Sequence, residues 1–174
     1  MLSRRRFGRS VLAGSGALLL PPVVGLASLA GCTRRSLAPE VAYTLLDGRP
    51  GHTAALRGKV LLVNFWATSC VTCVHEMPSL VATWRKYQRA GYEMLAVAMS
   101  YDPPAQVALF AETRALPFGV VIDNTGAIAR AFGDVSLTPT TFVIDKRGGI
   151  AQRYLGAPDF TELHQRVETL LAEA

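Results

Sequence analysis

Two cysteines separated by two residues, Cys70 and Cys73, are the side chains of this sequence best suited to covalent chemistry. An apolar run over 60–66, interrupted only by Asn64, precedes them and predicts a strand buried on both faces. A helical pattern then continues to about Arg89, which places Cys70 at the turn and Cys73 in the first helical turn. Unpaired N–H groups and the positive end of a helix dipole favour the reactive thiolate. Because two thiols this close can also form a disulfide, the pair indicates a dithiol/disulfide redox site.

Two other uses of a Cys-x-x-Cys pair have less support. A structural zinc site needs four ligands, usually from two such pairs, and this sequence has one pair. The histidines, His52, His75 and His164, show no spacing that ties them to one site, and His75 is expected on the exposed surface of the helix. A purely structural disulfide would close a loop too short to stabilise the fold much. We therefore expect no metal and no cofactor.

Strand and helix patterns alternate along the rest of the chain. We expect strands over 41–46, 52–56, 59–66, 92–100, 120–122, 141–145 and 150–155, and further helices over 102–115, 127–132 and 158–172. Asp102 is the expected N-cap of the 102–115 helix, and Pro78 is expected to kink the helix that follows the cysteines. Alternating strands and helices closed by a hairpin predict an α/β sandwich with a central mixed sheet.

The first 31 residues have the three parts of an export signal. The charged part contains Arg4, Arg5, Arg6 and Arg9. An apolar stretch over 11–30 follows and ends in Leu29-Ala30-Gly31-Cys32, which resembles a bacterial lipobox, whose cysteine is acylated and becomes the first residue of the mature chain. The segment Ser3 to Phe7 resembles the twin-arginine export motif, and the general secretion route stays open as an alternative.

Three fates of this N-terminus are open: a lipid anchor, an uncleaved membrane anchor or a cleaved signal. About 20 apolar residues are enough to span a bilayer, but Pro21-Pro22 makes a poor spanning helix. All three fates place the folded domain outside the cytoplasm, and lipidation of Cys32 also accounts for the third cysteine. We therefore expect an export signal over 1–31, a lipidated cysteine and tether over 32–39, and one domain over 40–174.

The basic charge of the chain comes mainly from that signal. The net charge is +5, but residues 1–31 hold 4 of the 18 basic residues and none of the 13 acidic ones, which leaves +1. Nucleic-acid binding therefore has no electrostatic support.

The residues around the cysteines resemble the thioredoxin superfamily, through Phe65-Trp66-Ala67-Thr68-Ser69-Cys70-Val71-Thr72-Cys73 after a buried strand. Three further segments narrow the resemblance to the TlpA/ResA-like branch of extracytoplasmic thiol–disulfide oxidoreductases. They are Leu56-Arg57-Gly58-Lys59-Val60, Glu76-Met77-Pro78 and the run from Thr138 to Asp145. The resemblance covers about 38–172. It implies a thioredoxin-like three-layer sandwich with a helix and strand inserted at about 102–122.

By this resemblance Cys70 is the exposed attacking thiol, Cys73 is the buried resolving thiol, and the two form a redox-active disulfide. Glu76 would tune the thiol pKa and relay the proton that Cys73 must lose. An exposed helix-surface glutamate is the alternative. Asn64 stands where cytoplasmic thioredoxins carry a buried aspartate and cannot ionise, so a proton relay would fall to Glu76 or water.

The resemblance also implies a substrate-binding surface. The Thr138–Pro139 bond would be cis and would leave backbone groups of Thr138 free to pair with an extended substrate. The alternative is an ordinary proline at a strand start. Trp66 is also assigned to the surface that contacts substrate.

We therefore expect a monomeric, membrane-tethered thiol–disulfide reductase on the periplasmic side of the bacterial envelope, in the inner or outer membrane. Its substrates would be disulfide-containing envelope proteins such as apocytochrome c. A membrane electron donor of the CcdA or DsbD type is implied, because an oxidising compartment supplies no reductant. The alternative is a copper metallochaperone for oxidase assembly, although such proteins usually carry Cys-x-x-x-Cys and a distant histidine. A peroxidase motif is absent from the sequence.

Overall fold

The computed structural model describes residues 35–173, so the expected export signal and the lipidated Cys32 lie outside it. The strands are β1 (Ala42–Thr44), β2 (Pro50–His52), β3 (Val60–Trp66), β4 (Tyr92–Ala98), β5 (Gly119–Ile122), β6 (Thr140–Ile144) and β7 (Ile150–Leu155). The helices are α1 (Val71–Tyr87), α2 (Pro104–Thr113), α3 (Ala127–Ala131) and α4 (Phe160–Ala172), with 3-10 turns η1 (Thr53–Leu56) and η2 (Gln88–Ala90). This order matches the predicted alternation closed by a hairpin.

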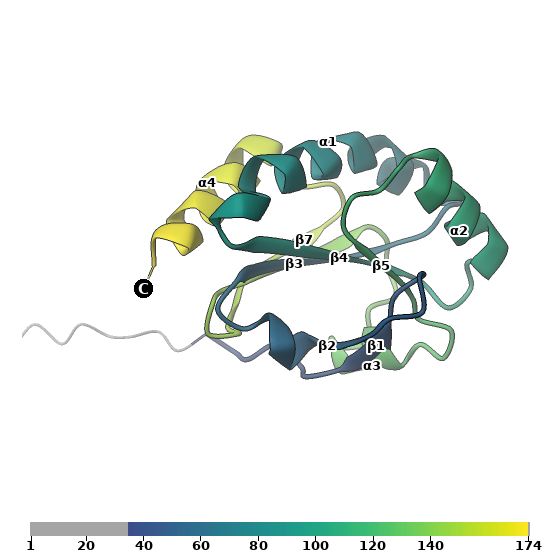
Figure 1. Cartoon of the computed structure of the whole chain (residues 1–174), viewed down its shortest axis with the longest axis horizontal. Coiled ribbons are helices and arrows are strands. Elements are labelled where there is room, and N and C mark those ends of the chain that lie inside the picture. Colours follow the sequence, from purple (N-terminus) through teal and green to yellow (C-terminus); the bar gives the residue numbers. More distant parts are fainter. Residues whose placement is uncertain (1–34, 174) are drawn as a thin grey trace, which may run out of the picture. The chain divides into compact units, whose positions relative to one another are not determined.

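One mixed sheet has the order β5-β4-β3-β6-β7 (Figure 1). Strands β3, β4 and β5 are parallel, whereas β6 is antiparallel to β3 and β7 is antiparallel to β6. All seven residues of β3 are buried, as its apolar run predicted. Because β3 and β6 run in opposite directions, the loop after Trp66 and the loop before Thr140 lie at the same end of the sheet. We call this the cysteine end.

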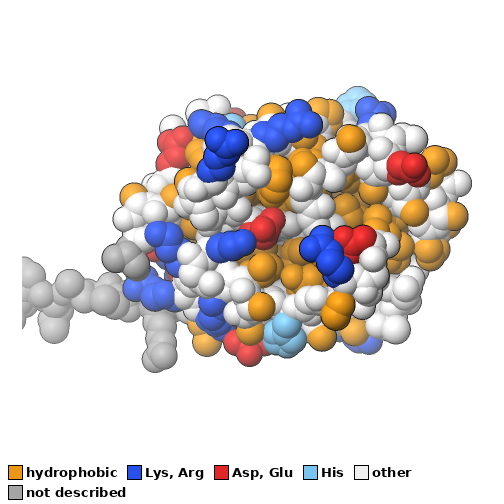
Figure 2. Space-filling model, viewed as in Figure 1, with side chains coloured by type: hydrophobic (Ala, Val, Ile, Leu, Met, Phe, Trp, Pro, Cys, Tyr) orange, Lys and Arg blue, Asp and Glu red, His pale blue; other side chains and the backbone are white. Residues whose placement is uncertain are grey.

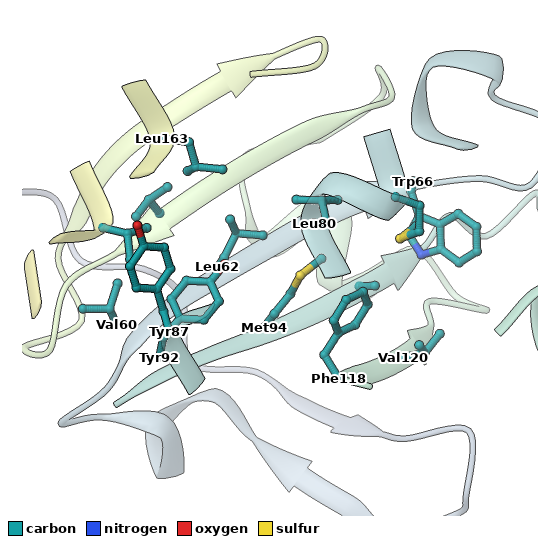
Figure 3. Packing of buried hydrophobic residues seen from close by; sticks show 14 of the residues in the cluster. Val60, Leu62, Trp66, Leu80, Tyr87, Tyr92, Met94, Phe118, Val120 and Leu163 are labelled. Atoms are coloured by element: carbon teal, nitrogen blue, oxygen red, sulfur yellow. The ribbon is translucent and has the colours of Figure 1, made fainter. Parts of the chain in front are cut away.

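The two faces of the sheet are covered by different elements. Helices α1, α2 and α4 cover one face, and α3 with the β1–β2 pair covers the other (Figure 1). Side chains alternate along β3, so Val60, Leu62 and Trp66 belong to the core cluster beneath the three helices (Figure 3). Leu61, Val63 and Phe65 belong to the cluster on the opposite face. The three-layer sandwich with a central mixed sheet is confirmed.

Two local predictions were wrong. The strand expected over 52–56 is instead β2, which ends at His52, followed by η1. His52 Nδ1 accepts a hydrogen bond from the Ala54 N–H at 3.2 Å and so caps the turn that replaces the strand. Asp102 does not cap α2, because Pro103 occupies the N-cap position and the Asp102 carboxylate is engaged elsewhere. Helix α2 and strand β5 fill the expected 102–122 insertion, and β5 forms one edge of the sheet.

The described part of the expected tether is bound to the domain. Arg35 forms ion pairs with Asp145 at 2.8 Å and with Glu173 at 3.0 Å. The Ala38 N–H donates to Gly148, and Ser36 accepts from Ile150, each at 2.8 Å. These contacts surround the turn after β6, which lies at the end of the sheet opposite the cysteine end. Within residues 35–173, no helix is both long and apolar enough to cross a membrane.

Candidate active site

Cys70 and Cys73 are joined by a disulfide at the start of α1, with their Cα atoms 5.3 Å apart. Cys70 is the N-cap residue of this 17-residue helix, and its Sγ accepts a hydrogen bond from the Cys73 N–H at 3.2 Å. Cys70 is partly exposed, whereas Cys73 is completely buried. Solvent and a substrate can therefore reach the sulfur of Cys70 but not that of Cys73.

The N-terminus of α1 provides the electrostatic setting for a thiolate at Cys70. The first N–H groups of a helix lack intrahelical partners, and the helix dipole places partial positive charge there. The Cys73 N–H already points at the Cys70 sulfur in the disulfide form. Once the disulfide is reduced, the same donor favours the thiolate, which is the nucleophile in disulfide exchange.

Three buried polar side chains from β6, β3 and α1 are joined by hydrogen bonds on the helix-covered face of the sheet. Asn64 lies on the face of β3 that α1 covers, and its Nδ2 donates to Glu76 Oε1 and to Thr141 Oγ1, each at 3.0 Å. Glu76 is 4% exposed, so it is not the exposed glutamate of the alternative interpretation. Its second oxygen, Oε2, has no partner among the described residues. One turn of α1 separates Glu76 from Cys73.

Burial raises the pKa of Glu76 to about 7, and the hydrogen bond from Asn64 opposes part of that rise. The carboxyl group can therefore exchange a proton near neutral pH, where a general acid or base is most effective. When ionised, it also disfavours a second negative charge on a neighbouring thiol. Asn64 positions this carboxyl group. The sequence contained a signal for such a role, because Asn64 is the one polar residue in an otherwise apolar strand.

The shifted pKa of Glu76 predicts a pH-dependent stability of the oxidised protein. The pKa is about 7 in the folded state and about 4.5 when unfolded, so the folded state binds more protons between these values. The contribution of Glu76 to stability is then fully present below pH 4.5 and is lost as pH rises through about 7, by about 3 kcal/mol between acidic and mildly alkaline pH. Urea unfolding at several pH values measures this slope.

The Glu76→Gln variant is the matched control, because an amide keeps an acceptor for Asn64 but does not titrate. Its stability is expected to lack that part of the pH dependence. An identical slope in the variant and the native protein would show that other groups cause it.

The loop before β6 meets the redox motif at the cysteine end. The Thr138–Pro139 peptide bond is cis, the isomer that the resemblance implied. Pro139 is buried and Thr138 is partly exposed. Among the described residues, neither the N–H nor the C=O of Thr138 takes part in a hydrogen bond. These two groups can therefore pair with an extended polypeptide.

Trp66 does not belong to the substrate-contacting surface, which corrects the assignment made from the resemblance. Its side chain is completely buried at one end of the core cluster (Figure 3). It packs against Phe110 of α2, with ring centroids 5.0 Å apart. Trp66 lies on the same face of β3 as Val60 and Leu62, so it points into the core.

Sequence reasoning missed the role of Asp102. This residue is 2% exposed, and its two carboxylate oxygens accept from the N–H and the hydroxyl of Thr68, each at 2.6 Å. Thr68 lies two residues before Cys70, so Asp102 ties the start of the insertion to the turn that carries the disulfide. In the sequence, an acidic residue before Pro103-Pro104 does not indicate a contact with Thr68.

The three histidines do not form one site with the cysteines. His75 is exposed on α1, His52 caps η1, and His164 Nε2 is 2.9 Å from the Thr83 hydroxyl. Among residues 35–173, no group of three or more His, Cys, Asp or Glu side chains is placed to hold a metal ion.

Thioredoxin-like thiol–disulfide oxidoreductases are the class of protein that combines this sheet, a Cys-x-x-Cys disulfide at a helix start and a cis-proline loop beside it. The family model described as Redoxin matches residues 34–171. The thiol-disulfide oxidoreductase ResA of Geobacillus thermodenitrificans is 36% identical over 78% of this chain and 76% of its own length.

Two solved structures agree with these sequence matches. The solution structure of a Neisseria meningitidis protein assigned as a thioredoxin is 39% identical, with a TM-score of 0.72 over 76% of this chain and 88% of that one. The crystal structure of a thioredoxin-family thiol:disulfide interchange protein from Chlorobium tepidum is 28% identical, with a TM-score of 0.73 over 80% of this chain and 98% of that one. This chain belongs to the Redoxin family, and its activity is thiol–disulfide exchange.

Proposed function

We propose that this protein is an extracytoplasmic, lipid-anchored reductase of disulfides in bacterial envelope proteins. The observation that carries the direction of transfer is the buried Glu76 beside a buried Cys73. A carboxylate near the thiols disfavours the thiolate form. Thioredoxin-like proteins that stabilise their reduced form strongly are oxidants. A carboxyl group that opposes ionisation of the buried Cys73 therefore favours a reductant, while the helix start keeps Cys70 reactive.

The exchange proceeds in two steps. The Cys70 thiolate attacks one sulfur of the client disulfide, forms a mixed disulfide, and releases the other client sulfur as a thiol after protonation. Cys73 then gives up its proton, for which Glu76 is the acceptor, and attacks the Cys70 sulfur. The client leaves with two thiols, and two electrons have moved from the Cys70–Cys73 pair to the client.

The oxidised pair must then be reduced again. The envelope lacks a general thiol reductant, so we assign this step to a membrane electron donor of the CcdA or DsbD type. The proposed clients are envelope proteins with unwanted disulfides, including apocytochrome c, whose haem-site cysteines must be reduced before haem attachment. Residues 35–38 bind opposite the cysteine end, so an anchor attached through them leaves the disulfide unobstructed.

Thiol trapping in intact cells tests this proposal. The full chain, expressed in a bacterial host with a CcdA-type donor, is quenched with acid and alkylated. The Cys70–Cys73 pair is expected to be mostly reduced when the donor is present and oxidised when the donor gene is deleted. A pair that is oxidised in both strains would contradict a reductase.

Membrane fractionation of the Cys32→Ala variant tests the anchor. The native chain is expected in the membrane fraction, and the variant is expected to lose lipid labelling of the chain. Equal lipid labelling of both proteins would contradict lipidation at Cys32.

A further inference from the structure

A groove of about 660 Å³ opens beside the disulfide, between the turn before Cys70 and α2. Ser69 lines its inner end, and residues from the loop after β4 and from α2 line the rest. The chemistry described so far uses Cys70, Cys73 and Glu76 and leaves this groove without a role. Ser69 directly precedes Cys70 in the chain, which places the groove close to the redox site.

The groove is open to solvent, and polar side chains and an apolar wall together form its lining. Leu109 and Tyr101 are each 57% exposed on its wall. The Phe110 ring forms part of the lining and is held in place by Trp66 behind it. Exposed apolar side chains gathered at one place on a protein mark binding surfaces.

Most of the large exposed hydrophobic side chains of the described domain lie at the cysteine end. They are Val71, Tyr101, Leu109, Leu137 and Leu155, whereas Leu37 and Leu46 lie elsewhere. In Figure 2, hydrophobic side chains are more frequent toward the end that carries α2. An apolar occupant is therefore accommodated next to the disulfide rather than at the opposite end.

One positive charge lies at the outer part of the groove. The Arg114 guanidinium lies over the Phe110 ring, 5.6 Å from its centroid, and forms no ion pair with any described residue. Asp102 also lines the groove, but both of its carboxylate oxygens accept hydrogen bonds from Thr68. Arg114 is therefore the exposed charge of the lining and can pair with a negative group on a client.

Tyr101 connects the groove to the cis-proline loop. Its hydroxyl lies 3.4 Å from the Thr138 hydroxyl, and the backbone of Thr138 offers an unpaired donor and acceptor among the described residues. An extended polypeptide paired with Thr138 would pass Tyr101 on its way into the groove. Tyr101 therefore links the groove to the unpaired backbone groups of Thr138.

We propose that this groove selects client polypeptides that carry both a large apolar side chain and an acidic one within a few residues of the attacked cysteine. Leu109 and Phe110 receive the apolar side chain, and Arg114 pairs with the acidic one. The proposal rests on the proposed reductase function and adds the sequence context of its clients. Leu109 and Arg114 are specificity-determining residues, and neither takes part in the chemical exchange.

Reduction of matched disulfide peptides tests this assignment. Four peptides differ only near the cysteine, where leucine or serine is combined with glutamate or lysine. The reduced full chain in detergent is expected to reduce the Leu–Glu peptide about tenfold faster than the Ser–Glu peptide and several-fold faster than the Leu–Lys peptide at low salt. Leu109→Ser should remove the first preference, and Arg114→Gln should remove the second.

Two controls separate the groove from the redox chemistry. Leu37→Ser replaces a similarly exposed leucine, 64% exposed, at the opposite end and should keep both preferences. The rate with the small neutral disulfide bis(2-hydroxyethyl) disulfide should be the same in all variants. Equal rates for the four peptides would overturn the groove proposal while leaving the reductase intact. Failure to reduce any disulfide would instead overturn the proposed function.

Discussion

Replacing Cys70 with serine is expected to lower the rate of disulfide reduction by at least about 1000-fold, to the level of uncatalysed exchange. Cys70 carries the sulfur that a client can reach, whereas Cys73 is completely buried. A serine hydroxyl does not ionise near neutral pH and cannot form the mixed disulfide. The rate of peptide-disulfide reduction by the pre-reduced protein measures the effect.

The Cys73→Ser variant is the matched counterpart. It retains the attacking thiol but lacks the resolving one, so it is expected to accumulate a mixed disulfide with the client. Mass spectrometry of the trapped complex should place the client on Cys70. A client trapped through Cys73 in a Cys70→Ser protein, at a comparable rate, would contradict the assigned order of attack.

Replacing Trp66 with alanine is expected to destabilise the oxidised protein by about 3 to 5 kcal/mol, because a large cavity is left in the core. Trp66 is completely buried and contacts Phe110. Urea unfolding followed by far-ultraviolet circular dichroism measures the loss. The Trp66→Phe variant keeps an aromatic ring and is expected to lose less, about 1 to 2 kcal/mol.

The same two variants decide between a core role and a substrate-contacting role. A core role predicts that folded Trp66→Phe reacts with a small disulfide at the native rate. If Trp66→Ala instead had native stability and bound clients more weakly, the substrate-contacting role that the resemblance implied would be correct.

The position of the redox pair was predictable from local pattern. The apolar run of β3 followed by Cys70 and Cys73 correctly predicted a buried strand, a turn and a helix start, because strand burial and helix initiation both leave short-range signals. Even the face of Trp66 follows from the alternation of β3, which groups it with Val60 and Leu62. The error came from assigning its role by resemblance instead.

Contacts between distant segments were not predictable in this way. The hydrogen bond between Asp102 and Thr68 joins residues that are 34 positions apart in the sequence. The local preference for aspartate at helix N-caps led instead to the prediction that Asp102 caps α2. The pKa of Glu76 likewise depends on burial beneath β3 and on Asn64, twelve positions earlier in the chain. These properties arise only after the helices pack on the sheet, so single-sequence patterns carry little information about them.

The reduction potential of the Cys70–Cys73 pair is the most direct test of the central claim that this protein donates electrons. The purified full chain in detergent is equilibrated with defined ratios of reduced and oxidised dithiothreitol or glutathione, and its thiols are counted after acid quenching. A reductase in which Glu76 opposes ionisation of Cys73 should have a potential more negative than about −200 mV. A potential near −120 mV, that of a strong oxidant, would contradict the account.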